Sequence, residues 1–122
     1  FMEFDSADAA YQISNGTFGD LILHEMSHVI GSRTLWSGSA AGAPGYQELY
    51  VSGSGQYTGA EGLAADQNEF VGQSAATFVP VELGGGPGTA NGHWDKMDGG
   101  GSPTAITRVS DGADLRDMLM TG

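Results

Sequence analysis

The sequence feature that most constrains this chain is the run His24-Glu25-Met26-Ser27-His28. On an α-helix, two side chains four residues apart project from the same face, one turn above the other. Both imidazoles can therefore reach a single metal ion. Glu25 leans towards the same side, where a carboxylate can act as a general base on a metal-bound water molecule without being a ligand. The run thus predicts a helix that carries two metal ligands, His24 and His28, and one base, Glu25.

The residues around this run predict where the helix begins and ends. Thr17 fits an N-cap, with Asp20 three residues later, where the helix dipole favours negative charge. Gly31 is placed to end the helix with a left-handed residue. A helix that is apolar around most of its surface is typical of a protein interior, so we expect this one to be buried. The apolar positions are Leu21, Ile22, Leu23, Met26, Val29 and Ile30.

A catalytic zinc ion needs a third protein ligand and an open position for water. The chain has no Cys, so only His and carboxylates can complete the site. It has three His in all, which makes His93 the economical third ligand. The Gly-rich stretch over residues 84–92 can approach another backbone closely and deliver His93 to the helix. Four carboxylates are alternatives as the third ligand: Glu48, Glu61, Asp66 and Glu82.

Length and charge restrict the classes of function. The chain has 122 residues, enough for one domain with a modest core. Its 4 basic and 15 acidic residues give a net charge of -11, which argues against nucleic acid and anionic membrane surfaces as partners. No run is long and apolar enough to span a membrane. We interpret five acidic residues as a solvated surface, with a calcium site as the alternative: Asp95, Asp98, Asp111, Asp114 and Asp117.

The rest of the sequence predicts short elements between loops. We expect a helix to start within residues 5–8, a turn at Asn15-Gly16, and an amphipathic helix over residues 60–70. Pro80 favours an extended segment over residues 78–81. Short strands are expected in three places: residues 1–4, 46–51 and 105–109. With 21 Gly among the 122 residues, these elements predict a loop-rich α+β fold.

The motif and the segments around it resemble one family of metal-dependent peptidases. His24 to Gly31 reads HExxHxxG, the form found in metzincins, in which the Gly turns the chain towards a third His. In the short form that His would stand at position 34, which is Thr34 here. The chain instead resembles the bacterial leishmanolysin-like metallopeptidases, in which an insertion separates the Gly from the third His. The matching segments, in order, are Phe4 to Asp8, Ile22 to Met26, Thr34 to Trp36, Tyr57 to Ala60, Val79 to Glu82, Gly85 to Thr89, His93-Trp94 and Leu119 to Gly122.

This resemblance implies a secreted zinc endopeptidase that acts on proteins or peptides. It implies that His24, His28 and His93 bind the zinc, that Glu25 is the base, and that Met120 is the Met-turn residue beneath the metal. The fold would be an α+β, metzincin-like catalytic domain fragment with a central active-site helix, short strands and Gly-rich loops. Its parts would be a strand plus the active-site helix (1–31), an insertion (32–92), and the stretch from the third ligand to the Met-turn (93–122).

The sequence also suggests that this chain belongs to something larger. It starts at Phe1 rather than Met, and its last motif lies against the C-terminus, so we expect a fragment or a processed product. The remainder of its precursor, or another chain, would then be a partner. The alternative to a peptidase is a non-catalytic, zinc-ordered module of a larger extracellular protein. Glu25 favours the peptidase, because a structural zinc site has no use for a base and usually closes its fourth position.

Overall fold

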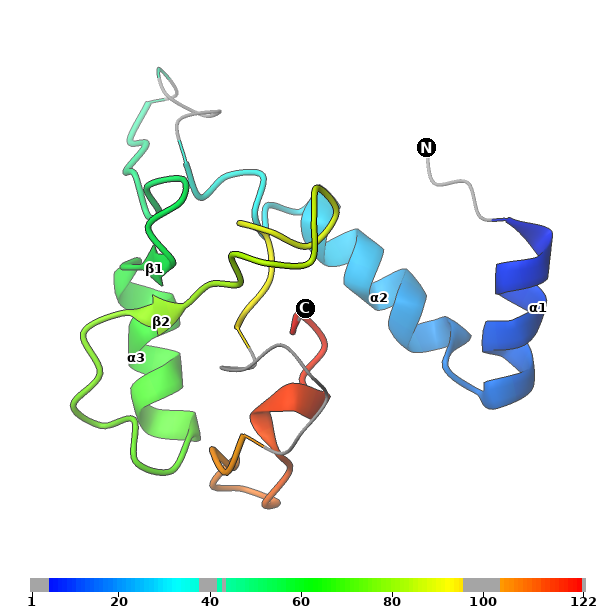
Figure 1. Cartoon of the computed structure of the whole chain (residues 1–122). Helices are drawn as coiled ribbons and strands as arrows, with labels where there is room; N and C mark the ends of the chain where they lie inside the picture. Colours follow the sequence, from blue (N-terminus) through cyan, green and yellow to red (C-terminus); the bar gives the residue numbers. More distant parts are fainter. Residues whose placement is uncertain (1–4, 38–41, 43, 96–103, 122) are drawn as a thin grey trace.

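The computed structural model describes residues 5–37, 42, 44–95 and 104–121, which form a mixed α+β structure (Figure 1). Its elements, in chain order, are α1 (Ser6–Asn15), α2 (Phe18–Val29), β1 (Gln56–Tyr57), α3 (Ala60–Glu69), β2 (Val79–Pro80) and the 3-10 helix η2 (Leu115–Asp117). The strand predicted over residues 1–4 lies outside the described residues. No helix within the described ranges has the length and apolar character needed to cross a bilayer.

Helix α1 begins and ends with the local signals expected from the sequence. The Asp5 side chain caps its start by accepting a hydrogen bond from the Ala7 N–H at 2.8 Å. Gly16 ends it in the left-handed region, with φ 75°, and the Gly16 N–H donates to the Ile13 carbonyl at 3.1 Å. The predicted helix start at residues 5–8 and the Asn15-Gly16 turn are therefore both confirmed.

Helix α2 has nearly the predicted bounds but a different cap and a different environment. Thr17 is the N-cap residue, but its hydroxyl donates to Gln12 rather than capping the helix. Gly31 follows the helix with a positive φ of 126°, as expected. The prediction that α2 is buried is wrong: four of its apolar residues or those just after it are 45–80 % exposed, namely Leu23, Met26, Val29 and Ile30.

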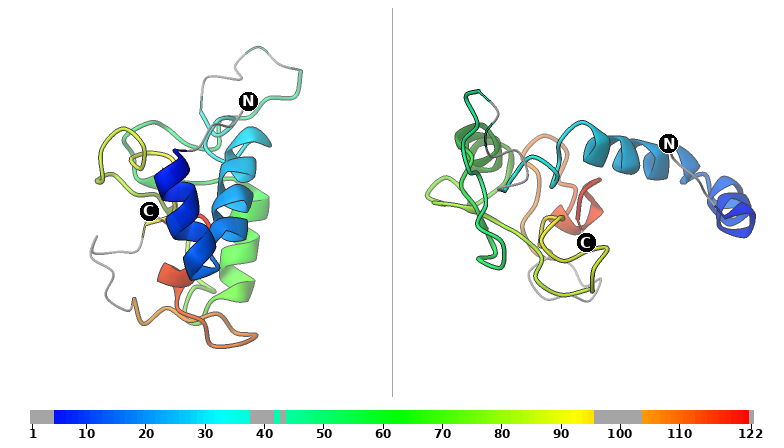
Figure 2. Two further views of the ribbon diagram at one scale, coloured as in Figure 1. Left: turned by 90° about the vertical axis from the view of Figure 1, so that its right-hand side faces the viewer. Right: turned by 90° about the horizontal axis from the view of Figure 1, so that it is seen from above.

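The exposure of α2 follows from how it is attached. It packs mainly against α1, and the resulting α1–α2 hairpin (residues 6–29) projects from the rest of the molecule (Figure 2). The contact that joins this hairpin to the remainder runs through the polar stripe of α2, where His24 meets Leu119 and His93. The apolar stripe consequently faces solvent instead of a core.

The core lies on the other side of the molecule, around the two-stranded sheet. Strands β1 and β2 are antiparallel, with Tyr57 opposite Val79. Trp36 stacks on Trp94 with ring centroids 4.6 Å apart, and it also contacts Tyr57 at 5.1 Å. The buried hydrophobic cluster consists of Trp36, Tyr50, Tyr57, Val79 and Val81. The helix predicted over 60–70 and the extended segment predicted over 78–81 are confirmed as α3 and β2, which pack together.

The strands predicted over residues 46–51 and 105–109 do not form, and these segments make isolated β-bridges instead. Within residues 46–51, Tyr50 alone pairs, with Tyr57. Within residues 105–109, Thr107 pairs with Asp114 and Arg108 with Phe70, because the chain turns back at Gly112 (φ 75°) after too few residues to extend a ladder. The Asp114 carboxylate holds this turn by accepting hydrogen bonds from the N–H groups of Thr104, Ala105 and Arg116.

Short pairings also carry His93 to its position. Val81 bridges to Trp94, and Trp94 bridges in parallel to Thr121. The Trp94 N–H donates to the Met120 carbonyl at 2.8 Å, while the Glu82 N–H donates to the His93 carbonyl at 2.9 Å. The His93-Trp94 segment is therefore fixed between the end of β2 and the segment that contains Leu119 and Met120.

Candidate metal centre

Three imidazoles meet where the α1–α2 hairpin joins the rest of the molecule. His24, His28 and His93 each offer a nitrogen, and these atoms all lie within 4.8 Å of one another. The Nε2 atoms of His24 and His93 are 2.9 Å apart. The three ring centroids are separated by 4.9–5.0 Å. The structure thus brings together the three His that the sequence predicted as metal ligands, and they can hold a metal ion.

A main-chain carbonyl fixes the other nitrogen of every ring. His24 Nδ1 lies 2.7 Å from the Leu119 carbonyl oxygen. His28 Nδ1 lies 3.2 Å from the carbonyl of Ser32, and His93 Nδ1 lies 3.0 Å from that of Thr89. Because a carbonyl oxygen can only accept, each Nδ1 must carry the proton. In the neutral rings Nε2 then carries the lone pair, as it does in His that bind a metal through this atom.

This arrangement of donors fits a transition metal ion. Two neutral imidazoles cannot hydrogen-bond through facing lone pairs, and a cation held between them would relieve the repulsion at the 2.9 Å contact between His24 and His93. Two nitrogens bound to one tetrahedral zinc ion at about 2.0–2.1 Å would lie about 3.3 Å apart. The Nε2 atoms of His24 and His93, at 2.9 Å, would therefore move apart slightly to bind zinc. Burial lowers the pKa of His93, and the nearby charges of His24, His28 and Arg33 lower it further, although the Thr89 carbonyl opposes them. The lowered pKa favours the neutral form of His93, which is the form that binds metal.

Two residues that the sequence analysis missed hold the loop before His93. Arg33 donates hydrogen bonds to the carbonyls of Pro87 at 3.2 Å and Gly88 at 3.4 Å. Its side chain lies against Gly92, where an added Cβ would come within 2.3 Å of Arg33 Cδ, so a larger residue at this position would displace the Arg33 side chain. The Asn91 carboxamide oxygen accepts from the Tyr50 hydroxyl at 2.5 Å and from the Gly53 N–H at 2.8 Å.

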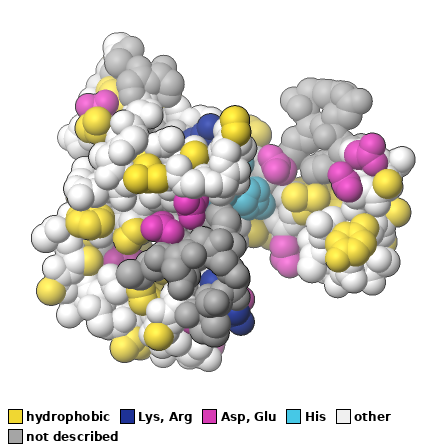
Figure 3. Space-filling view, in the orientation of Figure 1, with side chains coloured by type: hydrophobic (Ala, Val, Ile, Leu, Met, Phe, Trp, Pro, Cys, Tyr) yellow, Lys and Arg dark blue, Asp and Glu magenta, His cyan; other side chains and the backbone are white. Residues whose placement is uncertain are grey.

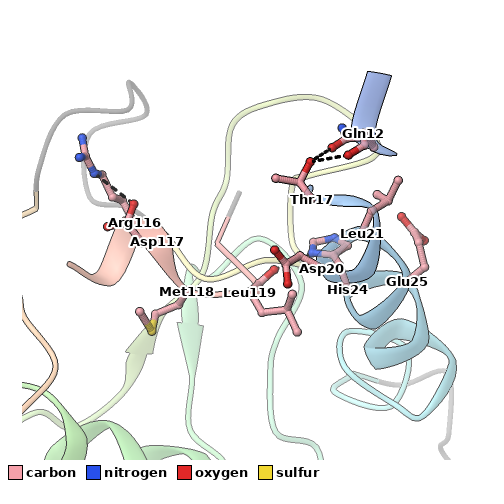
Figure 4. A pocket seen from close by; sticks show the side chains of 10 residues that line it. All are labelled: Gln12, Thr17, Asp20, Leu21, His24, Glu25, Arg116, Asp117, Met118 and Leu119. Atoms are coloured by element: carbon pink, nitrogen blue, oxygen red, sulfur yellow. Dashed lines mark hydrogen bonds and ion pairs between the residues drawn. The ribbon is translucent and has the colours of Figure 1, made fainter. Parts of the chain in front are cut away.

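A cleft of about 560 Å³ opens beside the His cluster. It lies between α2 and the segment around η2, and it is lined by Gln12, Thr17, Asp20, Leu21, His24, Glu25, Arg116, Asp117, Met118 and Leu119 (Figure 4). Asp20, one turn before His24, and His24 itself project towards Leu119, whereas Glu25 projects from the other side of α2. Among the described residues, Glu25 makes no hydrogen bond or ion pair.

Met120 is buried, with 8 % exposure, immediately after the residue whose carbonyl orients His24. Histidine atoms are visible at the surface where the hairpin meets the rest of the molecule, with acidic side chains nearby (Figure 3). Met120 therefore follows a residue that contacts the His cluster, and the cluster is reachable from solvent.

The alternative ligands do not join this centre. In the described ranges, the three His form the one group of metal-binding residues close enough to share an ion, without Glu48, Glu61, Asp66 or Glu82. The acidic residues considered for calcium do not form such a group either, and Asp98 lies outside the described residues. Asp111 instead pairs with Arg108, which lowers the pKa of the Asp111 carboxyl to about 2.

Comparison of this chain with protein-family models, curated protein sequences and solved structures found no match. The function of the chain is therefore inferred from the His cluster and the cleft beside it.

Proposed function

We propose that this chain is the catalytic part of a secreted, zinc-dependent endopeptidase of the leishmanolysin-like group of metzincins. One observation carries the proposal: three imidazoles, each held by a main-chain carbonyl, offer nitrogens that lie within 4.8 Å of one another, and two of them come from a helix in which Glu25 follows the first His. The HExxH motif has this chemistry in zinc peptidases.

Zinc is the metal that we expect here. Imidazole nitrogen is a common zinc ligand, and three protein ligands leave a fourth position for water, as catalytic zinc sites require. Zinc bound at this site would act as a Lewis acid and lower the pKa of its water molecule to about 7. The carbonyls of Leu119, Ser32 and Thr89 keep the three rings oriented for it.

The residues of the chain would move the proton and hold the substrate. The Glu25 carboxylate would accept a proton from the attacking water and pass that proton to the nitrogen of the leaving amine. Since no partner among the described residues holds Glu25, its side chain can turn towards the water position. The cleft that His24 and Glu25 line would receive the peptide beside these groups.

The test begins with zinc content, measured by elemental analysis of the purified chain and of His93→Ala. We expect about one zinc per chain, with three protein ligands, and a large loss in the variant. Glu25→Gln should keep the zinc but lower the cleavage of an unfolded protein by about 10²- to 10⁴-fold, the usual contribution of a general base. Chelator-sensitive cleavage that is unchanged in Glu25→Gln would refute the assignment of the base.

The second candidate is a non-catalytic, metal-ordered module. The orientation of Glu25, away from Leu119, favours it, as does the position of the His cluster at the junction of the hairpin with the rest of the chain. In that case Glu25→Gln and the wild-type chain would bind zinc equally, neither would cleave peptides, and zinc removal would change only stability.

A further inference from the structure

A second cavity, of about 280 Å³, lies between α3 and the segment around η2. One face of α3 lines it with residues at helical spacing: Gly62, Ala65, Asp66 and Glu69. The opposite wall is apolar and includes Leu115 and Met120, and Val79 and Trp94 also line the cavity. The volume is near the lower end of small-molecule sites, about 300–1,000 Å³, and suits a group of the size of one side chain.

Asp66 makes this cavity unusual. It is 7 % exposed, and its Oδ2 atom is buried without a hydrogen-bond partner. Burial raises the pKa of the Asp66 carboxyl, because the carboxylate form loses water that it would otherwise bind. No basic residue lines the cavity in the described part of the chain. A buried carboxylate of this kind is stabilised when a cation binds beside it.

The chemistry of the walls indicates the kind of cation. The carboxylates of Asp66 and Glu69 are the acidic groups of the lining, and together they supply at most four oxygens, too few for Ca²⁺, which takes six to eight ligands. An organic cation fits both features, because its alkyl part contacts the apolar wall while its charged end reaches Asp66. The Trp94 ring adds an aromatic surface that attracts such cations.

We propose that this cavity binds an alkylammonium or alkylguanidinium group, with Asp66 as its counter-ion. Free amines carry such groups, and so do the side chains of Lys and Arg. The cavity shares Met118 and Leu119 with the cleft beside His24, so a basic side chain of a peptide in that cleft could reach it. That last use, in substrate recognition, rests on the proposed function, whereas cation binding itself does not.

The experiment titrates the full chain, labelled with ¹⁵N, with n-butylammonium, n-butylguanidinium and, as a neutral control, 1-butanol. We expect both cations to shift the Trp94 indole N–H resonance and to bind at least about tenfold more tightly than 1-butanol, because a charge-assisted hydrogen bond forms. Asp66→Asn should weaken cation binding at least about tenfold, whereas Glu61→Gln, a matched change at an exposed position of α3 outside the cavity lining, should change it by less than about threefold.

Several outcomes would overturn the proposal. These are equal binding of 1-butanol and n-butylammonium, unchanged binding in Asp66→Asn, or no shift at Trp94. If Asp66→Asn does not fold, the comparison between the cations and 1-butanol in the wild-type chain still decides.

Two further experiments test where the bound cation comes from and whether its binding depends on the His cluster. A capped lysine amide that binds as butylammonium does, while capped norleucine does not, would identify a peptide side chain as the source; binding of the free amine alone would identify a free amine. His28→Ala should bind n-butylammonium like the wild-type chain, so the site can stand even if the peptidase proposal fails. Loss of binding in His28→Ala would contradict an independent site.

Discussion

Asn91 shows how a single residue sets the path of the loop that presents His93. Its backbone has a positive φ of 62°, and its side-chain oxygen accepts hydrogen bonds from the buried Tyr50 hydroxyl and from the Gly53 N–H. Asn91 therefore ties the Gly-rich loop to the edge of the core two residues before His93.

Substitutions at Asn91 should separate its backbone role from its side-chain role. Asn91→Gly accepts the positive φ but removes both hydrogen bonds, so we expect a loss of about 1–3 kcal/mol in the free energy of unfolding. Asn91→Asp keeps the acceptor and should lose less, while Asn91→Ala should lose most because it adds backbone strain. Urea denaturation measures the three variants; equal stability of Asn91→Gly and the wild-type chain would remove Asn91 from this role.

Asp66 should make stability depend on pH in the direction opposite to most carboxylates. Because burial raises its pKa in the folded chain, the unfolded chain ionises first as the pH rises above the ordinary value of 3.8. The contribution of Asp66 to stability is therefore fully present below that value and is lost as the pH rises through the folded pKa. Thermal unfolding of Asp66→Asn should show a gain over the wild-type chain at pH 7 and almost none at pH 3, whereas Glu69→Gln should show no such difference.

At the scale of elements, the α1–α2 hairpin depends on its turn. Gly16 has a φ of 75°, and an added Cβ would meet nothing within 4 Å, so Gly16→Ala carries a backbone cost without a clash. We expect it to destabilise the chain by about 1 kcal/mol. Gly19→Ala is the matched control, since Gly19 lies inside α2 and also has open space around it. That substitution should stabilise by about 0.5–1 kcal/mol, and opposite signs in the two midpoints of urea denaturation would confirm the prediction.

At the scale of the whole molecule, the His cluster joins the hairpin to the core. Removing a metal present at about 1,000 times its dissociation constant should lower the free energy of unfolding by about 4 kcal/mol. Amide hydrogen exchange should then accelerate in α2 far more than in α3, because α3 packs on the sheet and not on the His cluster. His93→Ala should show the same pattern without a chelator. Equal acceleration in both helices would show that the metal stabilises the fold as one unit.

The features of this chain that depend on neighbouring residues could be predicted from its sequence, and those that depend on distant residues mostly could not. Helix bounds and the His24–His28 pair could be predicted because helical spacing is a local property, and His93 could be predicted because the chain has three His and no Cys. The exposure of α2 could not, since an apolar stripe does not say what covers it. The strand pairings were too short to leave an alternating pattern, and the carbonyls that orient the imidazoles belong to residues of any type. The roles of Arg33 and Asn91 could not be predicted either, because the groups that they bind lie far away in the sequence.

The main-chain acceptors at the metal centre have a consequence for how this protein can vary. Since the orientation of the imidazoles depends on the carbonyls of Ser32, Thr89 and Leu119, the side chains at these positions are not required for it. Leu119 also lines both cavities. Substitution at that position should therefore reshape both cavities while the carbonyl that orients His24 is kept, so this residue is the place to change the cavities without changing the His cluster.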